Sequence, residues 1–259
     1  MSDVYNFSQN EILFFSLVLM RMTAFVVSWP VFGVETVSSH IKVLFATILT
    51  LIIFPTLHWT AHQAELLQSG FVLLVVREVF IGLCMGYLAR LFFFCFRIAG
   101  EMVSQAMGLG AAAMFNPAMG GQTSSVEQFY VTLATLFYLC VNGHHFLITG
   151  LVNSFQWAPA ALNSLNTSQF TGVGQMTEEI IELGLRFSAP VVVSILAVNL
   201  VLGIVGKTVP QLNVLVTSFP INILIGFFLL IITMPMLLDE MPGFLDSSTV
   251  KIFEFVKSF

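Results

Sequence analysis

Long apolar segments, separated by short polar or helix-breaking stretches, dominate the chain. A helix needs about 20 apolar residues to cross the hydrocarbon core of a bilayer, and one charge near its centre costs about 2.5 to 3.5 kcal/mol. Six segments meet or approach that length with few charges. They lie at about residues 12–29, 41–57, 71–99, 129–152, 187–206 and 214–238. The pattern predicts an all-α, multi-helix integral membrane protein that contains helical hairpins.

A polar, glycine-containing stretch at residues 164–177 separates four of these segments from the last two. It predicts an N-terminal helical block joined by a linker to a C-terminal hairpin. The expected divisions are residues 1–163 for the block, 164–186 for the linker and helix start, 187–238 for the hairpin and 239–259 for an amphipathic tail. The hairpin turn carries Lys207, Pro210, Gln211 and Asn213.

Composition supports a membrane setting. Of the 259 residues, 57% are hydrophobic and 9% are charged, whereas an ordinary soluble domain has about 25% charged residues. The formal net charge is −5, with only 9 Lys and Arg residues. The chain therefore lacks the positive surface that would attract a phosphate backbone, and nucleic-acid binding is excluded. Cys84, Cys95 and Cys140 lie in apolar runs without CxxC spacing, which favours small buried hydrophobes over disulfides or a zinc site.

Charged residues inside the apolar segments need an explanation. Arg21 lies in the first segment, and the third carries five charges on a helix of about 30 residues, roughly 45 Å long. Five lipid-facing charges would cost on the order of 10 kcal/mol, so these groups must meet protein or water. The expected buried charge pairs draw on Arg21, Arg77, Glu78, Arg90, Arg97, Glu101, Glu182 and Arg186.

Spacing suggests two of these pairs. Arg97 and Glu101 are four residues apart, as are Glu182 and Arg186, so each couple can form an ion pair on one helix face. Structural ion pairs and a direct role in transport both account for the charges. The Lys and Arg residues near the segment ends divide evenly between the two sides, so packing within a complex is expected to fix the arrangement.

Gly82 and Gly86 form a small-xxx-small pattern in the third segment, which predicts close packing against another helix. His58 and His62 also have helical spacing, but no acidic or cysteine partner is near them in the sequence, so we expect no metal site. The sequence shows no Ser/His/Asp grouping, no phosphate-binding loop and no pair of carboxylates in a catalytic arrangement. The sequence predicts no catalytic residues, no cofactor and no enzymatic activity.

The most unusual stretch, residues 107–122, is here called the glycine-methionine strip. Its glycines and its proline break a helix, yet it contains no charge, whereas an exposed loop would normally be more polar. Irregular backbone at membrane depth survives only where protein buries it or where it lines an aqueous cavity. Two functions fit: lining or closing a pore, and an ordinary connection packed against neighbouring helices. The candidate plug residues are Met107, Gly108, Gly110, Met114, Phe115, Asn116, Pro117, Met119, Gly120 and Gly121.

Short motifs spread over most of the chain resemble the FliR family of the flagellar export gate and its counterparts in virulence secretion systems. The run Asn142, Gly143, His144 and the later turn at residues 210–214 are the most specific. The other matching pieces are Arg21, Pro30, Phe32, Gly33, residues 99–101 and 107–109, Asn116, Pro117, Ala189, Pro190, Lys207, Phe219 and Pro220.

The resemblance implies a core subunit of the flagellar type III protein export gate. In that family the subunit joins FliP-like and FliQ-like subunits in a helical cone through which unfolded flagellar proteins leave the cytoplasm, with FlhB-like and FlhA-like components as further partners. It implies a multi-pass protein of the bacterial inner membrane at the flagellar basal body, in contact with lipid. It further implies a FliP-like block at residues 1–163, a FliQ-like hairpin at residues 187–238 and a plug formed by the glycine-methionine strip.

Other functions stay open. A virulence-type (injectisome) export gate would carry similar motifs. A free-standing small-solute transporter would place a midplane site at Arg21, Glu78 or Arg90 and would be stable alone or as a homodimer. A membrane-embedded enzyme would use His58 and His62.

Overall fold

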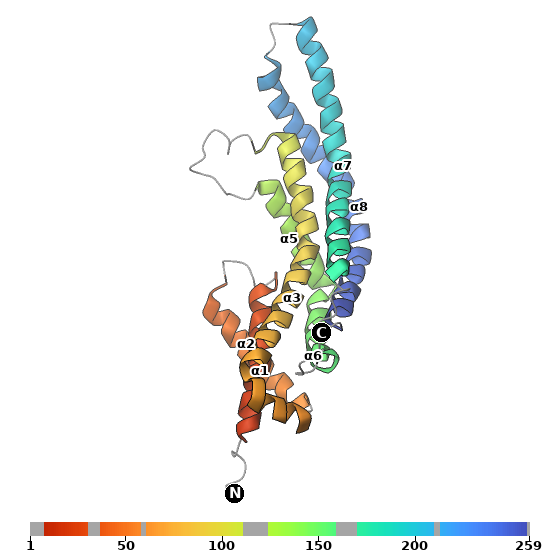
Figure 1. Cartoon of the computed structure of the whole chain (residues 1–259). Helices are drawn as coiled ribbons and strands as arrows, with labels where there is room; N and C mark the ends of the chain where they lie inside the picture. Colours follow the sequence, from red (N-terminus) through yellow and green to blue (C-terminus); the bar gives the residue numbers. More distant parts are fainter. Residues whose placement is uncertain are drawn as a thin grey trace. The chain divides into compact units, whose positions relative to one another are not determined.

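The computed structural model describes residues 8–30, 37–57, 61–110, 124–158, 170–209 and 213–257, and the regular structure in these ranges is helical. The helices (Figure 1) are α1 (Gln9–Ser28), α2 (Ser39–Ile53), the short 3-10 helix η1 (Phe54–Thr56), α3 (Ala61–Met107), α5 (Ser125–Cys140), α6 (Gly143–Trp157), α7 (Phe170–Thr208) and α8 (Val214–Val256). The predicted all-α fold is confirmed.

Most of these helices are long and apolar enough to cross a membrane. Among the described residues, five stretches qualify by length and composition: Gln9–Ser28, Ser39–Thr56, Gly70–Met107, Gly172–Thr208 and Val216–Val256. Helices α5 and α6 qualify together as one further, bent span. The six apolar segments seen in the sequence correspond to these stretches, as a multi-helix membrane protein requires.

The fourth apolar segment, residues 129–152, is not one helix. Helix α5 ends at Cys140 and α6 begins at Gly143, and the two are bent by 68°. Asn142 lies between them with φ 58°, a left-handed conformation that Asn adopts more readily than most residues. Apolar content predicted the membrane-length stretch, but the local preference of Asn142 and Gly143 breaks it.

Helix ends extend beyond the apolar segments. Helix α7 begins at Phe170, so the second half of the polar stretch at residues 164–177 is helical. Helix α8 continues to Val256, through most of the predicted tail at residues 239–259. Apolar content marks the part of a helix that faces lipid or protein, whereas the backbone hydrogen bonds of a helix continue into polar sequence.

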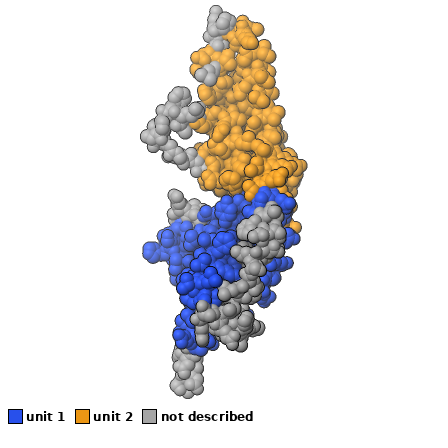
Figure 2. All heavy atoms as spheres, viewed as in Figure 1, with its two compact units in different colours: residues 1–91, 142–175, 247–259 blue, residues 92–141, 176–246 orange. Residues whose placement is uncertain are grey.

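The chain packs into two compact units (Figure 2). Unit 1 takes residues 1–91, 142–175 and 247–259, and unit 2 takes residues 92–141 and 176–246. Each unit draws on residues from both sides of the predicted linker, and the division into an N-terminal block and a hairpin stays a prediction.

Unit 1 is organised around α1. The Ser8 hydroxyl accepts the backbone N–H of Glu11, and the Glu11 carboxylate accepts the backbone N–H of Ser8, so a capping box fixes the helix start. Phe14 and Leu17 of α1 then pack against Leu74 of α3 in the core. This buried face of α1 also carries a charged residue, one turn beyond Leu17.

Unit 2 has an aromatic core in which four helices meet. Phe96 of α3 stacks on Phe187 of α7 with ring centroids 5.8 Å apart, and it lies 6.5 Å from Phe244 of α8. Tyr138 of α5 packs edge-on against Phe93 of α3 at 5.5 Å. Aromatic pairs in these geometries stabilise a core beyond their area alone, so this cluster holds α3, α5, α7 and α8 together.

Candidate functional site

Arg21 of α1 and Glu78 of α3 form a buried, two-point ion pair in unit 1. Nε of Arg21 donates to Oε2 of Glu78 at 2.5 Å, and Nη2 donates to Oε1 at 2.9 Å. The two side chains are 0% and 1% exposed. Parallel bonds of this kind fix orientation as well as distance, so the pair determines how α1 and α3 meet.

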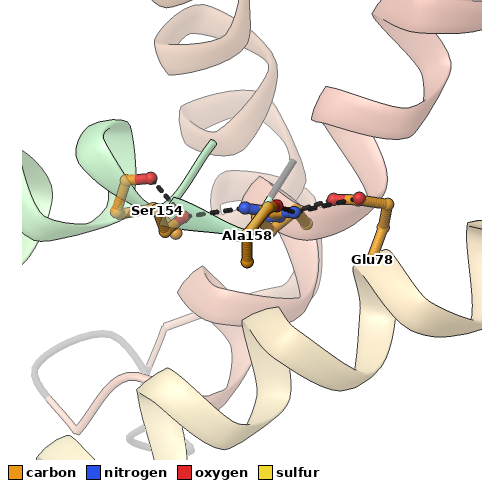
Figure 3. Close-up of polar contacts among 5 residues, drawn as sticks. Glu78, Ser154 and Ala158 are labelled. Atoms are coloured by element: carbon orange, nitrogen blue, oxygen red, sulfur yellow. Dashed lines mark hydrogen bonds and ion pairs between the residues drawn. The ribbon is translucent and has the colours of Figure 1, made fainter. Parts of the chain in front are cut away.

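The other donors of Arg21 bind α6 (Figure 3). Nη1 donates to Oγ of Ser154 at 2.9 Å, and Nη2 also donates to the backbone oxygen of Ala158 at 2.9 Å. Ala158 is the C-cap of α6, where helix carbonyls lack intrahelical partners. The Arg21 guanidinium carbon also lies 4.1 Å from the centre of the Phe155 ring. One guanidinium thus joins α1, α3 and α6, and we call Arg21, Glu78, Ser154 and Ala158 the arginine lock.

The arginine lock has the geometry of a structural contact. A guanidinium has five N–H donors, and the four bonds described above occupy four of them. The Ser154 hydroxyl itself donates to the backbone oxygen of Leu151 at 2.6 Å. A solute could bind here only by separating two buried charges, which is strongly unfavourable. The geometry therefore disfavours a solute site at Arg21 and Glu78.

Gly82 and Gly86 lie where α3 approaches α1. A Cβ on Gly82 would lie 2.9 Å from the Ala24 Cβ, and a Cβ on Gly86 would lie 2.9 Å from the Phe25 backbone oxygen. Such distances leave no room for a side chain, so glycine permits this close contact. Glu78 lies on the same face of α3, four residues before Gly82, and the glycines therefore set the helix separation at which the ion pair forms.

Arg97 pairs with a neighbouring helix. Its Nε donates to Oε1 of Glu127 in α5 at 2.7 Å, while Glu101 accepts a hydrogen bond from Gln105 at 2.8 Å. The predicted pair of Arg97 with Glu101 is wrong. Spacing along one helix shows that two residues can meet, but α5 packs against α3 so closely at Gly100 that a Cβ there would lie 2.6 Å from the Glu127 Cα. This contact supplies the competing carboxylate.

Arg186 also pairs across helices. Its Nη2 lies 3.6 Å from Oε1 of Glu240 in α8. The predicted pair of Arg186 with Glu182 is therefore wrong as well, for the same reason: a carboxylate on the packed neighbour replaces the one on the same helix.

Burial differs among the eight predicted charges. Arg21 and Glu78 are buried, and two others, Arg77 and Glu101, are partly buried. The exposed ones are Arg90, Arg97, Glu182 and Arg186. Within this chain, the two charges of the lock are therefore buried and these four are exposed. Exposed charges on helices of membrane length still require water or another protein around them.

Most of the glycine-methionine strip lies outside the described residues. Met107, Gly108 and Gly110 are described. The plug candidates outside the described ranges are Met114, Phe115, Asn116, Pro117, Met119, Gly120 and Gly121, and the same holds for Phe32, Gly33, His58, Pro210 and Gln211.

The described residues of the hairpin turn have ordinary capping roles. Lys207 lies in the last turn of α7, where a positive charge is favourable beside the free carbonyls. Oδ1 of Asn213 accepts the backbone N–H of Val216 at 3.4 Å, at the start of α8.

In the part of the chain that the structure describes, no group of three or more His, Cys, Asp or Glu residues could hold a metal ion. The side chain of His62 is not among the described ones. Cys84, Cys95 and Cys140 are free thiols; Cys95 is buried and Cys84 partly buried, whereas Cys140 is exposed, so the expectation of burial is wrong for Cys140.

Sequence reasoning missed the partners that complete these contacts. Ser154 and Ala158 lie more than a hundred residues from Arg21 in the chain, and no motif marks them. Glu127 did carry a signal, because Ser124 and Glu127 have the spacing of a helix N-cap. The Ser124 hydroxyl accepts the backbone N–H of Glu127 at 3.1 Å. That cap fixes the start of α5 and places the carboxylate beside Arg97.

Comparison with known proteins indicates one family. The family described as Bacterial export proteins, family 1, matches residues 12–248. The chain is 35% identical over 223 residues to the flagellar biosynthetic protein FliR of Bacillus subtilis (strain 168), covering 85% of each chain. It is 28% identical to FliR of Pectobacterium carotovorum subsp. carotovorum, over 91% of this chain and 88% of the relative. It is 29% identical to FliR of Escherichia coli (strain K12), over 85% and 83%. The family match includes the arginine lock, α7 and most of α8.

Proposed function

Because the chain belongs to family 1 of the bacterial export proteins, we propose that it is a non-enzymatic, membrane-embedded component of the flagellar protein export apparatus. The relatives described above are flagellar biosynthetic proteins, which favours a flagellar over a virulence-type system. The several long apolar helices favour the bacterial inner membrane as its location, at the flagellar basal body.

Exposed guanidinium groups within membrane-length helices carry the proposal of a multi-subunit assembly. Arg97 is 56% exposed in the stretch Gly70–Met107, and Arg186 is 57% exposed in the stretch Gly172–Thr208. Each has a carboxylate partner, but more than half of each side chain remains uncovered. A charged group in contact with lipid costs several kcal/mol, so a neighbouring protein or an aqueous channel should cover these groups.

In the proposed assembly the chain joins FliP-like and FliQ-like subunits in a helical cone, and unfolded flagellar proteins pass through its pore. FlhB-like and FlhA-like export components are further partners. Residues 1–163 take the FliP-like position and the hairpin at residues 187–238 the FliQ-like position. Exposed apolar side chains along that hairpin, such as Leu200, Leu224 and Phe228, suit contact with lipid or with helices of neighbouring subunits.

Purification of the tagged chain in mild detergent is expected to recover FliP-like and FliQ-like proteins in a fixed ratio. The exposed charges should be covered by those subunits, and such contacts survive mild detergent better than lipid contacts do. Mass spectrometry identifies the recovered proteins, with an equally tagged, unrelated multi-pass protein as the control. A stable monomer or homodimer that moves a small solute in liposomes would contradict the proposal and favour the transporter.

The glycine-methionine strip is proposed to close the pore at rest. Its lack of charge suits a seal that excludes ions, and methionine and glycine can adapt to whatever passes.

Deleting residues 108–121 is expected to raise ion leakage through the purified complex. The deletion removes the proposed seal while α3 and α5 keep their packing at Arg97 and Glu127. Ion flux from liposomes that contain the complex measures the effect, and wild-type complex at equal density is the reference. Unchanged conductance in a fully assembled complex would remove the plug function.

A further inference from the structure

Helix α3 exposes a narrow line of side chains in unit 1. Its exposed positions follow one another at alternating steps of four and three residues: Val76, Phe80, Leu83, Tyr87 and Arg90. The first four are between 42% and 60% exposed. Such a repeat averages about 3.5 residues, the spacing at which side chains of one helix meet a second helix in a coiled coil. We call these residues the α3 seam.

The chain itself buries α3 on both sides of the seam. Ile81 and Met85 are 0% exposed and Leu88 is 2% exposed. Gly82 and Gly86 pack against α1. A helix that borders lipid exposes a broader face, as α7 does: in the most apolar part of α7 only 11% of the residues are buried, against 39% in that of α3. An exposed line this narrow suits contact with one further helix better than contact with a bilayer.

Arg90 defines the chemistry that the covering helix must have. Its side chain is exposed, and no carboxylate in the described part of the chain forms an ion pair with it, whereas Arg97 pairs with Glu127. Arg90 lies in the membrane-length stretch Gly70–Met107, in line with the apolar seam residues. A guanidinium in apolar surroundings costs several kcal/mol without a counter-charge, and its planar donors match a carboxylate best. The covering helix should therefore place an Asp or Glu opposite Arg90.

We propose that the α3 seam is a docking face for one helix of a neighbouring export subunit, which presents apolar side chains to the first four seam residues and a carboxylate to Arg90. The inference rests on the proposed multi-subunit assembly and deepens it, because it gives the surface on this chain and the chemistry of the partner. The ion pair fixes the register of the two helices, since sliding by one turn would leave both charges unpaired among apolar side chains.

Photo-crosslinking in the purified complex tests the seam. A photo-reactive amino acid in place of Tyr87 is expected to crosslink to one peptide of a partner subunit, with an Asp or Glu in that peptide, and mass spectrometry identifies it. The same amino acid in place of Val250, which is 48% exposed in α8, is the matched control and should not give this product. The inference is overturned if position 87 crosslinks to lipid alone, to a second copy of this chain, to a peptide without a carboxylate or to nothing.

Charge reversal tests the ion pair. Arg90→Glu is expected to lower recovery of the crosslinked subunit roughly tenfold, because two carboxylates would then face each other across the contact. Replacing the identified Asp or Glu of the partner with Arg in the same complex should restore most of that recovery, and this rescue separates a broken contact from a misfolded chain. Undiminished recovery with Arg90→Glu, or no rescue by the exchanged pair, would overturn the inference.

The seam and the assembly fail in different ways. If the tagged wild-type chain recovers FliP-like and FliQ-like subunits but position 87 crosslinks to no protein, the seam is wrong and the proposed assembly stands. If the wild-type chain is recovered alone, the assembly fails and the seam inference fails with it.

Discussion

Replacing Arg21 with Met is expected to abolish flagellar protein export and to lower the thermal unfolding midpoint by about 10 °C. The change leaves the Glu78 carboxylate, 1% exposed, without its cation, and losing one partner of a buried ion pair costs about 3–5 kcal/mol. It also removes the bonds to Ser154 and Ala158, so α1, α3 and α6 lose their common contact. Fluorescence-detected size exclusion after heating measures stability, and the amount of flagellar protein in the culture medium measures export.

The double variant Arg21→Met, Glu78→Leu distinguishes a structural lock from a transport site. An apolar pair of similar volume removes both buried charges, so a large part of the lost stability should return, although the bonds to Ser154 and Ala158 stay lost. If the pair is only structural, export returns as well; a stable double variant that exports nothing would show that the charges act directly. For the stability of the isolated chain, Arg186→Met is the matched control, because both partners of its pair are exposed, Arg186 by 57% and Glu240 by 40%, and such a pair contributes about 0–1 kcal/mol.

The pattern of apolar residues predicted the helices well because burying a charge in lipid is costly at any position. That cost also showed that Arg21 needed a partner. It could not show which partner, since Glu78 and Ser154 reach Arg21 across 57 and 133 residues of chain. Helix packing sets those contacts, and no spacing rule in one sequence describes it.

The wrong ion pairs have one physical origin. Spacing of four residues places Arg97 near Glu101 and Arg186 near Glu182 on any regular helix, but the gain of such a pair is only about 0.3–0.5 kcal/mol. A carboxylate from a packed neighbour, such as Glu127 held by the cap of α5, replaces it readily. Local rules therefore described the glycine contact of α3 better than its charge pairs. A close helix contact at glycine requires only that the side chain be absent, whereas an arginine can pair with any carboxylate within reach.

That glycine contact gives the second large effect: Gly86→Ala is expected to separate α3 from α1 and to weaken the arginine lock. The new Cβ would lie 2.8 Å from the Ser28 Cβ and 2.9 Å from the Phe25 backbone oxygen, so the helices must move apart, at a cost of about 1–3 kcal/mol. Glu78 lies two helical turns before Gly86 on the same face, and its bonds to Arg21 should lengthen. The thermal midpoint and export should both fall, and Gly86→Val should lower them further.

Substitution of Ser28 tests whether this steric contact is the cause. Ser28→Gly removes the side-chain part of the clash but not the Phe25 oxygen, so it should partly rescue Gly86→Ala. It should not rescue Gly82→Ala, whose new Cβ meets Ala24 and the Arg21 backbone instead. Gly203→Ala in α7, with open space around a built Cβ, controls for loss of a glycine in an apolar helix. Equal rescue of both variants by Ser28→Gly would contradict the contact, because a general gain in stability does not distinguish position 82 from position 86.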